Sequence, residues 1–204
     1  MRGLRKEGRR ASLTLFPALL VIGLLALGCA GTASATVLCK TATDPCTGGT
    51  YAKGTVLEAS LKSGTKWKLV EGVGTLECGE AAIKGAVTNP GPEGPVAGSV
   101  SSLSFGKCNN TVEVLKTGTF RIGSPSGSNG TLTLEGFEIK SIIAGVECIY
   151  GGPASISLTG GEMASAKASS TLTKTSGIFL CVQQAEWTAE FTVTAPEPLY
   201  VSSS

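Results

Sequence analysis

Histidine is absent from this chain of 204 residues, and aspartate occurs only once, at Asp44. A protein without histidine lacks the usual general base of Ser-His-Asp and Cys-His enzymes, the usual nitrogen ligand of zinc and the usual pH switch. One aspartate cannot supply a calcium loop of the D-x-D-x-D-G type. These absences favour a protein without catalytic activity, and we expect neither a metal nor another cofactor.

The first 35 residues have the pattern of an export signal. Five basic residues precede position 11, an apolar run follows over residues 13–27, and Ala33-Ser34-Ala35 matches an A-x-A cleavage site. The apolar run is shorter than the roughly 20 residues that span a bilayer but fits the core of a signal peptide. We therefore predict a signal peptide over residues 1–35 and a secreted, extracellular protein that begins at Thr36.

A second interpretation of the leader involves lipid attachment. Residues Ala26-Leu27-Gly28-Cys29 resemble a bacterial lipobox, in which Cys29 would be lipidated and become the new N-terminus. The protein would then be anchored by lipid at the cell surface, and membrane contact is expected only through this anchor. Cleavage after Ala35 and lipidation of Cys29 both stay open at this point.

Basic charge belongs mainly to the leader. Five of the 17 basic residues and one of the 15 acidic residues lie before Thr36, which leaves 12 basic and 14 acidic residues with Arg121 as the only arginine. No cluster of basic residues is visible in this remainder. Because binding to phosphate backbones depends on such clusters, we predict no nucleic-acid partner.

Six cysteines follow the leader, and an even number in an exported protein indicates disulfide bonds. Structural zinc sites and redox motifs place thiols in C-x-x-C pairs, which do not occur here. Six cysteines allow many connectivities, among which the spacing favours joining neighbours in order. The expected pairs are Cys39–Cys46, Cys78–Cys108 and Cys148–Cys181.

Alternation with a period of two dominates the rest of the chain. In Ala185–Ala195, alanine, tryptophan, phenylalanine and valine occupy every second position, and glutamate and threonine lie between them. A strand with one buried and one solvated face requires this pattern. Similar short runs, separated by segments rich in Gly, Pro, Asn and Ser, recur over residues 55–61, 66–70, 74–78, 101–105, 111–115, 130–135, 137–140 and 154–158.

Many short strands at this spacing predict an all-β protein, an antiparallel β-sandwich or a barrel-like sheet stapled by disulfides. No amphipathic helix longer than two turns is expected. We predict one domain over residues 36–204, with a division into two similar lobes near residues 123–130 as the alternative.

Three classes of function remain. The first is a non-catalytic secreted or surface-associated β-protein that binds a ligand or has a structural role, with a glycan or a component of the cell envelope as the partner classes. The second is a carbohydrate-binding module that stacks a sugar on Trp67 or on a tyrosine (Tyr51, Tyr150 or Tyr200). The third and least favoured is a hydrolase that uses a pair of glutamates, Glu77 with Glu80 or Glu186 with Glu190.

Several short segments also resemble a known group of proteins. They are Thr36-Val-Leu-Cys-Lys-Thr41 with a second cysteine at Cys46, residues 62–65, residues 103–105 before Cys108, and the tail 187–193 followed by 198–201. In these segments the chain is similar to uncharacterised exported bacterial all-β proteins of about 200 residues that contain cysteine. The resemblance implies export and an all-β fold, and it implies no activity.

Overall fold

The structure is a computed structural model that describes residues 35–204, and their contacts form one compact unit. Every regular element in this range is a strand, and all strands pair antiparallel, which confirms the predicted all-β antiparallel class. The strands are β1 (Thr36–Cys39), β2 (Val56–Leu61), β3 (Trp67–Glu71), β4 (Gly74–Asn89), β5 (Val96–Cys108), β6 (Thr111–Lys116), β7 (Thr119–Ser126), β8 (Asn129–Glu135), β9 (Glu138–Ile143), β10 (Val146–Gly151), β11 (Ala154–Thr159), β12 (Ser165–Gly177), β13 (Gln184–Ala195) and β14 (Tyr200–Ser203).

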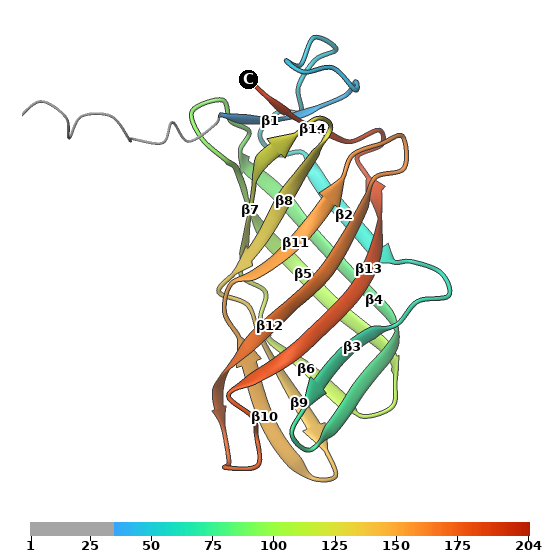
Figure 1. The fold of residues 1–204 in the computed structure, drawn as a ribbon, viewed down its shortest axis with the longest axis vertical. Helices are drawn as coiled ribbons and strands as arrows, with labels where there is room; N and C mark the ends of the chain where they lie inside the picture. The colour runs from blue at the N-terminus through green and yellow to red at the C-terminus, as the bar shows by residue number, and fades with distance from the viewer. Residues whose placement is uncertain (1–34) are drawn as a thin grey trace, which may run out of the picture. The chain divides into compact units, whose positions relative to one another are not determined.

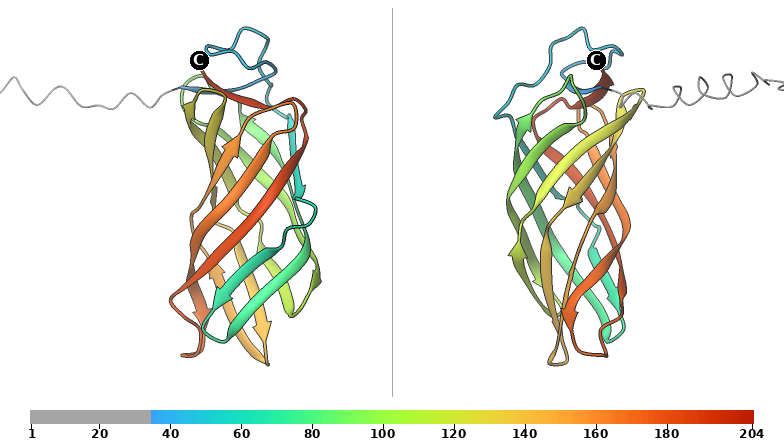
Figure 2. Two further views of the ribbon diagram at one scale, coloured as in Figure 1. Left: turned by 45° about the vertical axis from the view of Figure 1, so that its right-hand side comes forward. Right: turned by 90° about the vertical axis from the view of Figure 1, so that its left-hand side faces the viewer.

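Eight of these strands close into a ring. Their order is β2-β4-β5-β7-β8-β11-β12-β13, and β13 pairs again with β2. Of the two predicted architectures, the strand pairings therefore give the closed, barrel-like sheet rather than two separate sheets packed face to face. Figures 1 and 2 show the strands winding around a common interior. A closed sheet has no free edge along its paired length, and its interior is filled by alternate side chains of each strand.

Four long strands, β4, β5, β12 and β13, run through the whole barrel, and shorter strands complete the wall in two halves. In the half that we call the lid half, the short strands are β2, β7, β8 and β11. In the other, the tip half, they are β3, β6, β9 and β10. The predicted division near residues 123–130 falls at the β7–β8 turn, within the sheet (Figure 1).

The alternation in β13 has the predicted effect. Trp187, Phe191 and Val193 are buried on its inner face, whereas Glu186 and Thr188 on its outer face are exposed. The neighbouring strand β12 follows the same rule with smaller residues, since Ala166, Ala168 and Leu172 point inward. The hydrophobic core is thus the interior of the barrel, filled from all sides by alternating strands.

A small second sheet covers one end of the barrel. It consists of β1 and β14, and together with residues 40–51 we call it the lid. Backbone hydrogen bonds fasten it to the rim, from the Thr36 amide to Gly94 and from the Val201 amide to Ser128. Leu38 and Val201 extend the core into the lid.

One predicted loop is a strand instead. The Gly- and Ser-rich segment 123–130 was expected to separate strands, but β7 continues to Ser126 and a two-residue turn at Gly127 and Ser128 leads directly into β8. The ladder shifts register between Gly123 and Ser126. This bulge accommodates Pro125, which has no amide proton for the ladder.

Residues 1–34 of the predicted signal peptide (residues 1–35), among them the candidate lipidation residue Cys29, lie outside the described residues. Within the described range, no helix has the length and apolar character needed to cross a membrane.

Candidate functional site

The interior of the lid half contains a cavity of about 60 Å³. Its wall receives side chains from all eight strands of the closed ring. Glu58 is the one lining residue with a polar side chain, and its carboxylate forms an ion pair with Lys84 at 2.6 Å. The apolar lining residues are Leu57, Ala59, Ile83, Gly85, Val100, Phe120, Leu132, Leu134, Ile156, Leu158, Ala166, Phe191 and Val193.

Glycines shape one side of this cavity. A Cβ atom placed on Gly98 would lie 2.1 Å from Cζ of Phe120, and one placed on Gly85 would lie 3.1 Å from Cε1 of the same ring. The Phe120 ring therefore lies flat over two strands that lack side chains at these positions. A larger residue at Gly98 would push this ring into the cavity.

Aromatic side chains separate the cavity from the tip half. The rings of Trp67 and Phe105 lie 4.7 Å apart, and those of Phe137 and Trp187 lie 6.2 Å apart. They enclose a second, much smaller cavity of about 10 Å³ that shares Ile83, Leu134 and Phe191 with the first. Trp67 is only 2% exposed, so its ring is not available to stack a sugar at the surface. The stacking role predicted for Trp67 does not fit this position.

The barrel wall has a seam between β5 and β6. Only two residues connect these strands, yet β6 pairs with β9 alone, and β5 beyond Ser99 pairs only with β4. Two half-buried side chains of this part of β5, Leu103 and Phe105, line the smaller cavity. The least tightly bonded part of the described wall therefore lies beside the apolar interior.

The tip half contains a buried acidic residue. Glu71 is 6% exposed, and its pKa is raised, chiefly by loss of solvation. The hydroxyl groups of Ser141 and Tyr150 lie near enough to lower this pKa in part, although neither forms a hydrogen bond of normal geometry with the carboxyl group. The pKa of the Tyr150 phenol is raised in turn, first by burial and then by Glu71. Burial therefore favours the neutral acid over the carboxylate more strongly at Glu71 than at an exposed glutamate.

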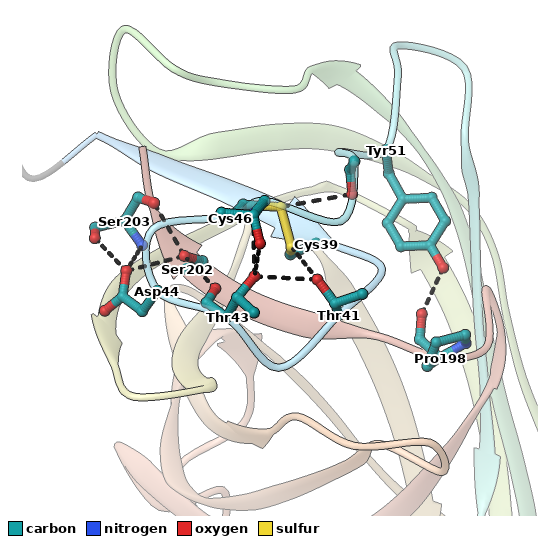
Figure 3. Close-up of a disulfide and its surroundings, with 11 residues drawn as sticks. Cys39, Thr41, Thr43, Asp44, Cys46, Tyr51, Pro198, Ser202 and Ser203 are labelled. Carbon is teal, nitrogen blue, oxygen red and sulfur yellow. Dashed lines mark hydrogen bonds between the residues drawn. A yellow bond between two sulfur atoms is a disulfide. The ribbon is translucent and has the colours of Figure 1, made fainter.

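Hydrogen-bonded polar side chains surround the Cys39–Cys46 disulfide of the lid (Figure 3). Asp44 accepts hydrogen bonds from the Ser202 hydroxyl at 3.0 Å, from the Ser203 amide at 3.2 Å and from the Ser203 hydroxyl. The Ser203 hydroxyl, followed by that of Ser202, lowers the pKa of the Asp44 carboxyl. The only aspartate of the chain thus fastens the disulfide loop to β14.

A groove of about 380 Å³ lies beside this loop. Tyr51 lines it and donates a hydrogen bond from its hydroxyl to the carbonyl of Pro198 (Figure 3). The Lys40 ammonium lies 5.5 Å from the centre of the Tyr51 ring and covers one of its faces. The other two tyrosines considered for sugar stacking, Tyr150 and Tyr200, are buried.

The glutamates considered for hydrolysis lie on the outer face of the sheet. Glu77 pairs with Lys66 at 2.5 Å and Lys68 at 2.9 Å, and hydrogen bonds from these lysines lower the pKa of its carboxyl. Three of the four carboxylates considered, those of Glu77, Glu80 and Glu190, are therefore bound to lysine ammonium groups rather than to each other. The further pairs are Glu80 with Lys107 and Glu190 with both Lys62 and Lys167.

All three expected disulfides are present: Cys39–Cys46, Cys78–Cys108 and Cys148–Cys181. Within residues 35–204, no group of three or more Cys, Asp or Glu side chains is arranged to hold a metal ion. The apolar cavity and the buried Glu71 were not identified from the sequence. The alternation in β3 offered a signal for Glu71. Because Trp67, Leu69 and Glu71 occupy every second position, their side chains lie on the same face of the strand.

No protein-family model, curated protein or solved structure matches this chain. The functional argument therefore depends on the interior of the barrel and on its surface.

Proposed function

We propose that this protein is a non-catalytic, exported binding protein that takes a small apolar molecule, or the end of an acyl chain, into the interior of the lid half. The observation that carries the proposal is the cavity of about 60 Å³ lined, apart from Glu58, by apolar residues of eight strands. Closed barrels of eight strands have an interior just large enough for side chains or for one small ligand.

The chemistry of the wall decides which ligand fits. A buried water molecule needs two to four polar partners, and the side chains around this cavity provide none that point inward. A cavity of 60 Å³ left empty costs roughly 1.4 kcal/mol at about 24 cal/mol per Å³. An apolar group that fills it would recover this free energy and would add the benefit of its own transfer from water.

The seam between β5 and β6 supports a route of entry. Separation of two unpaired strands breaks no ladder hydrogen bond, whereas opening the wall elsewhere would break several. Leu103 and Phe105 would then contact a chain that passes from the seam toward the cavity. A ligand with a longer tail could leave part of its length in the seam.

Export is part of the same proposal. Three disulfides are typical of proteins that fold in an oxidising compartment. We propose secretion, with attachment through a lipid on Cys29 as the alternative.

Displacement of an apolar dye tests the binding site. The fluorescent fatty acid cis-parinaric acid, whose slender chain can place its end in a cavity of about 60 Å³, should gain fluorescence when it binds the protein, and straight-chain fatty acids of increasing length should displace this dye. The Ala166→Leu variant should bind about tenfold or more weakly, because each methylene excluded from the cavity forfeits about 0.8 kcal/mol. Ser165→Leu is the matched control, because this neighbouring side chain points outward and is exposed. Equal binding by the two variants would place the dye outside the cavity and refute the proposal.

A glycan in the groove of the lid is the second candidate. The groove of about 380 Å³ and the half-buried Tyr51 ring that lines it favour it. A glycan array probed with the wild-type protein and with Tyr51→Ala tests this candidate. Glycan signals that disappear in the variant, together with no dye displacement, would replace the apolar ligand by a sugar.

A further inference from the structure

Three hairpin turns project together from the end of the barrel opposite the lid (Figures 1 and 2). They connect β3 with β4, β9 with β10 and β12 with β13. The segments at this end are residues 72–76, 141–146 and 175–185, and none of them contains Lys, Arg, Asp or Glu. We call these three segments the tips.

The longest tip exposes consecutive apolar side chains. Ile178 is 51% exposed, Phe179 is 89% exposed and Leu180 is 44% exposed. Large apolar side chains are scattered singly elsewhere on the surface, whereas three in a row on a projecting turn form a continuous apolar surface. The flanking Thr175, Ser176, Gln183 and Gln184 are exposed, polar and uncharged.

The chain holds this tip in place from within. Cys181 is bonded to Cys148 on β10, and its amide donates to the carbonyl of Ile178 at 3.1 Å. The Lys174 ammonium donates to the carbonyl of Cys181 at 3.2 Å. Gly177 has a φ of 129°, and a Cβ atom there would lie 2.7 Å from Sγ of Cys181. The tip therefore has a defined conformation that directs Phe179 away from the core.

The surface of a lipid bilayer is the partner that fits these observations. A protein partner would need a concave pocket to enclose a projecting tip. A bilayer needs no pocket, because apolar side chains that project farther from the protein than its charged side chains can insert into it. Removing charge from water into the headgroup region is costly, and the tips contain no charged residue to remove. Polar uncharged side chains beside an apolar tip suit the depth of the headgroups.

We propose that the tips dock this protein on the surface of a lipid bilayer, with Phe179 as the main inserted side chain. The nearest charges do not favour anionic lipid. Behind the tips lie Lys68, Lys140 and Lys174 together with Glu77, Glu147, Glu186 and the buried Glu71, so that basic residues are not in excess. Docking should therefore be driven by apolar insertion, and zwitterionic vesicles should bind as well as anionic ones at any salt concentration.

Sedimentation with phosphatidylcholine vesicles tests the proposal. The polypeptide of residues 35–204 is the protein to use, because it contains every described strand and disulfide and forms one compact unit. Phe179→Ser should lower the partition coefficient at least tenfold, since the inserted aromatic ring is lost. Met163→Ser is the matched control, because Met163 is 77% exposed in the β11–β12 turn near the lid, and it should bind like the wild type.

A fluorescent variant separates insertion from loss of structure. Phe179→Trp should keep its affinity, because tryptophan favours the membrane interface, and its emission should shift to shorter wavelength when vesicles are added. Met163→Trp should show no shift. No vesicle binding by the wild type, or equal shifts in the two tryptophan variants, would refute the proposal. The proposal would also be refuted if the wild type formed a dimer and bound no vesicles, and if Phe179→Ser dissociated this dimer. That result would identify a second copy of the chain as the partner. None of these readouts depends on the internal cavity, so this proposal and the proposed function can fail separately.

Discussion

The lid half and the tip half of the barrel are built on the same four long strands but have different interiors. The lid half is lined by aliphatic side chains and Phe120, and it leaves a cavity of about 60 Å³. The tip half holds Trp67, Trp187 and Tyr150 together with the buried Glu71. Within the described residues, the buried polar side-chain atoms without a hydrogen-bond partner are the Glu71 carboxyl oxygens, the Tyr150 hydroxyl and the Trp187 indole nitrogen, all in the tip half.

Most of the tip-half residues named above come from short strands, since Trp67 and Glu71 lie on β3 and Tyr150 lies on β10, whereas Trp187 belongs to the long strand β13. Inward positions of β8 and β11 carry leucine and isoleucine, whereas those of β3 and β10 carry tryptophan, glutamate, cysteine and tyrosine. One alternating framework can therefore combine an apolar, underfilled interior with one that is filled and partly polar. Cross-linking follows the same division, since two of the three disulfides lie in the tip half.

Removal of disulfides should produce the largest effect and should distinguish the two halves. Replacing Cys148 and Cys181 by alanine opens a loop with a separation of 33 residues and should lower the free energy of unfolding by about 4 kcal/mol. Replacing Cys39 and Cys46, with a separation of seven, should lower it by about 2.5 kcal/mol. Urea unfolding of both double variants measures the difference. A larger loss at the lid than at the tip half would contradict this order.

Enlarging a small inward residue should have an intermediate effect of opposite sign in the two halves. Ala185 is fully buried in the tip half and lines neither of the two interior cavities described above, so Ala185→Leu should lower the free energy of unfolding by about 1–3 kcal/mol. The leucine of Ala166→Leu would extend into the cavity of the lid half. This substitution should leave the free energy of unfolding unchanged or raise it by about 1 kcal/mol. Equal losses in thermal or urea unfolding would mean that both halves are filled to the same extent.

The sequence predicted the fold class and the disulfides because both depend on local signals. Alternation in β13 was strong enough to assign every inward residue, and the joining of neighbouring cysteines matched the pairing of adjacent strands. The strand β12 was not identified, because its inward residues are small apart from Leu172 and its outward residues are serine, lysine and threonine. With such small inward side chains, the contrast between the two faces is weak, and pairing with β13 decides the structure.

The candidate site was beyond prediction for a different reason. The cavity exists only where eight strands meet, and no single segment records that their summed side-chain volume leaves space. The local sequence also does not determine whether Trp67 is buried, because lysines lie on both sides of it. Its burial depends on contact with Phe105, which belongs to a strand distant in sequence. The tip at Ile178 to Leu180 was visible as an apolar run, but only the turn geometry shows that it projects outward.

Neutralising Glu71 should produce the smallest effect, and its dependence on pH identifies it. Above the ordinary pKa of 4.5, the unfolded carboxyl releases its proton while the folded one, with its raised pKa, still holds it. The free energy of unfolding therefore falls as pH rises from the unfolded pKa toward the raised folded pKa of Glu71. Glu71→Gln should remove this fall and should be more stable than the wild type at mildly alkaline pH. Thermal unfolding across pH measures this. Glu77→Gln is the control of opposite sign, since lysines lower the pKa of Glu77, and its small loss at neutral pH should disappear in acid. Parallel pH profiles for the wild type and Glu71→Gln would mean that Glu71 ionises as readily in the folded protein as in the unfolded chain, so that burial does not hold its proton.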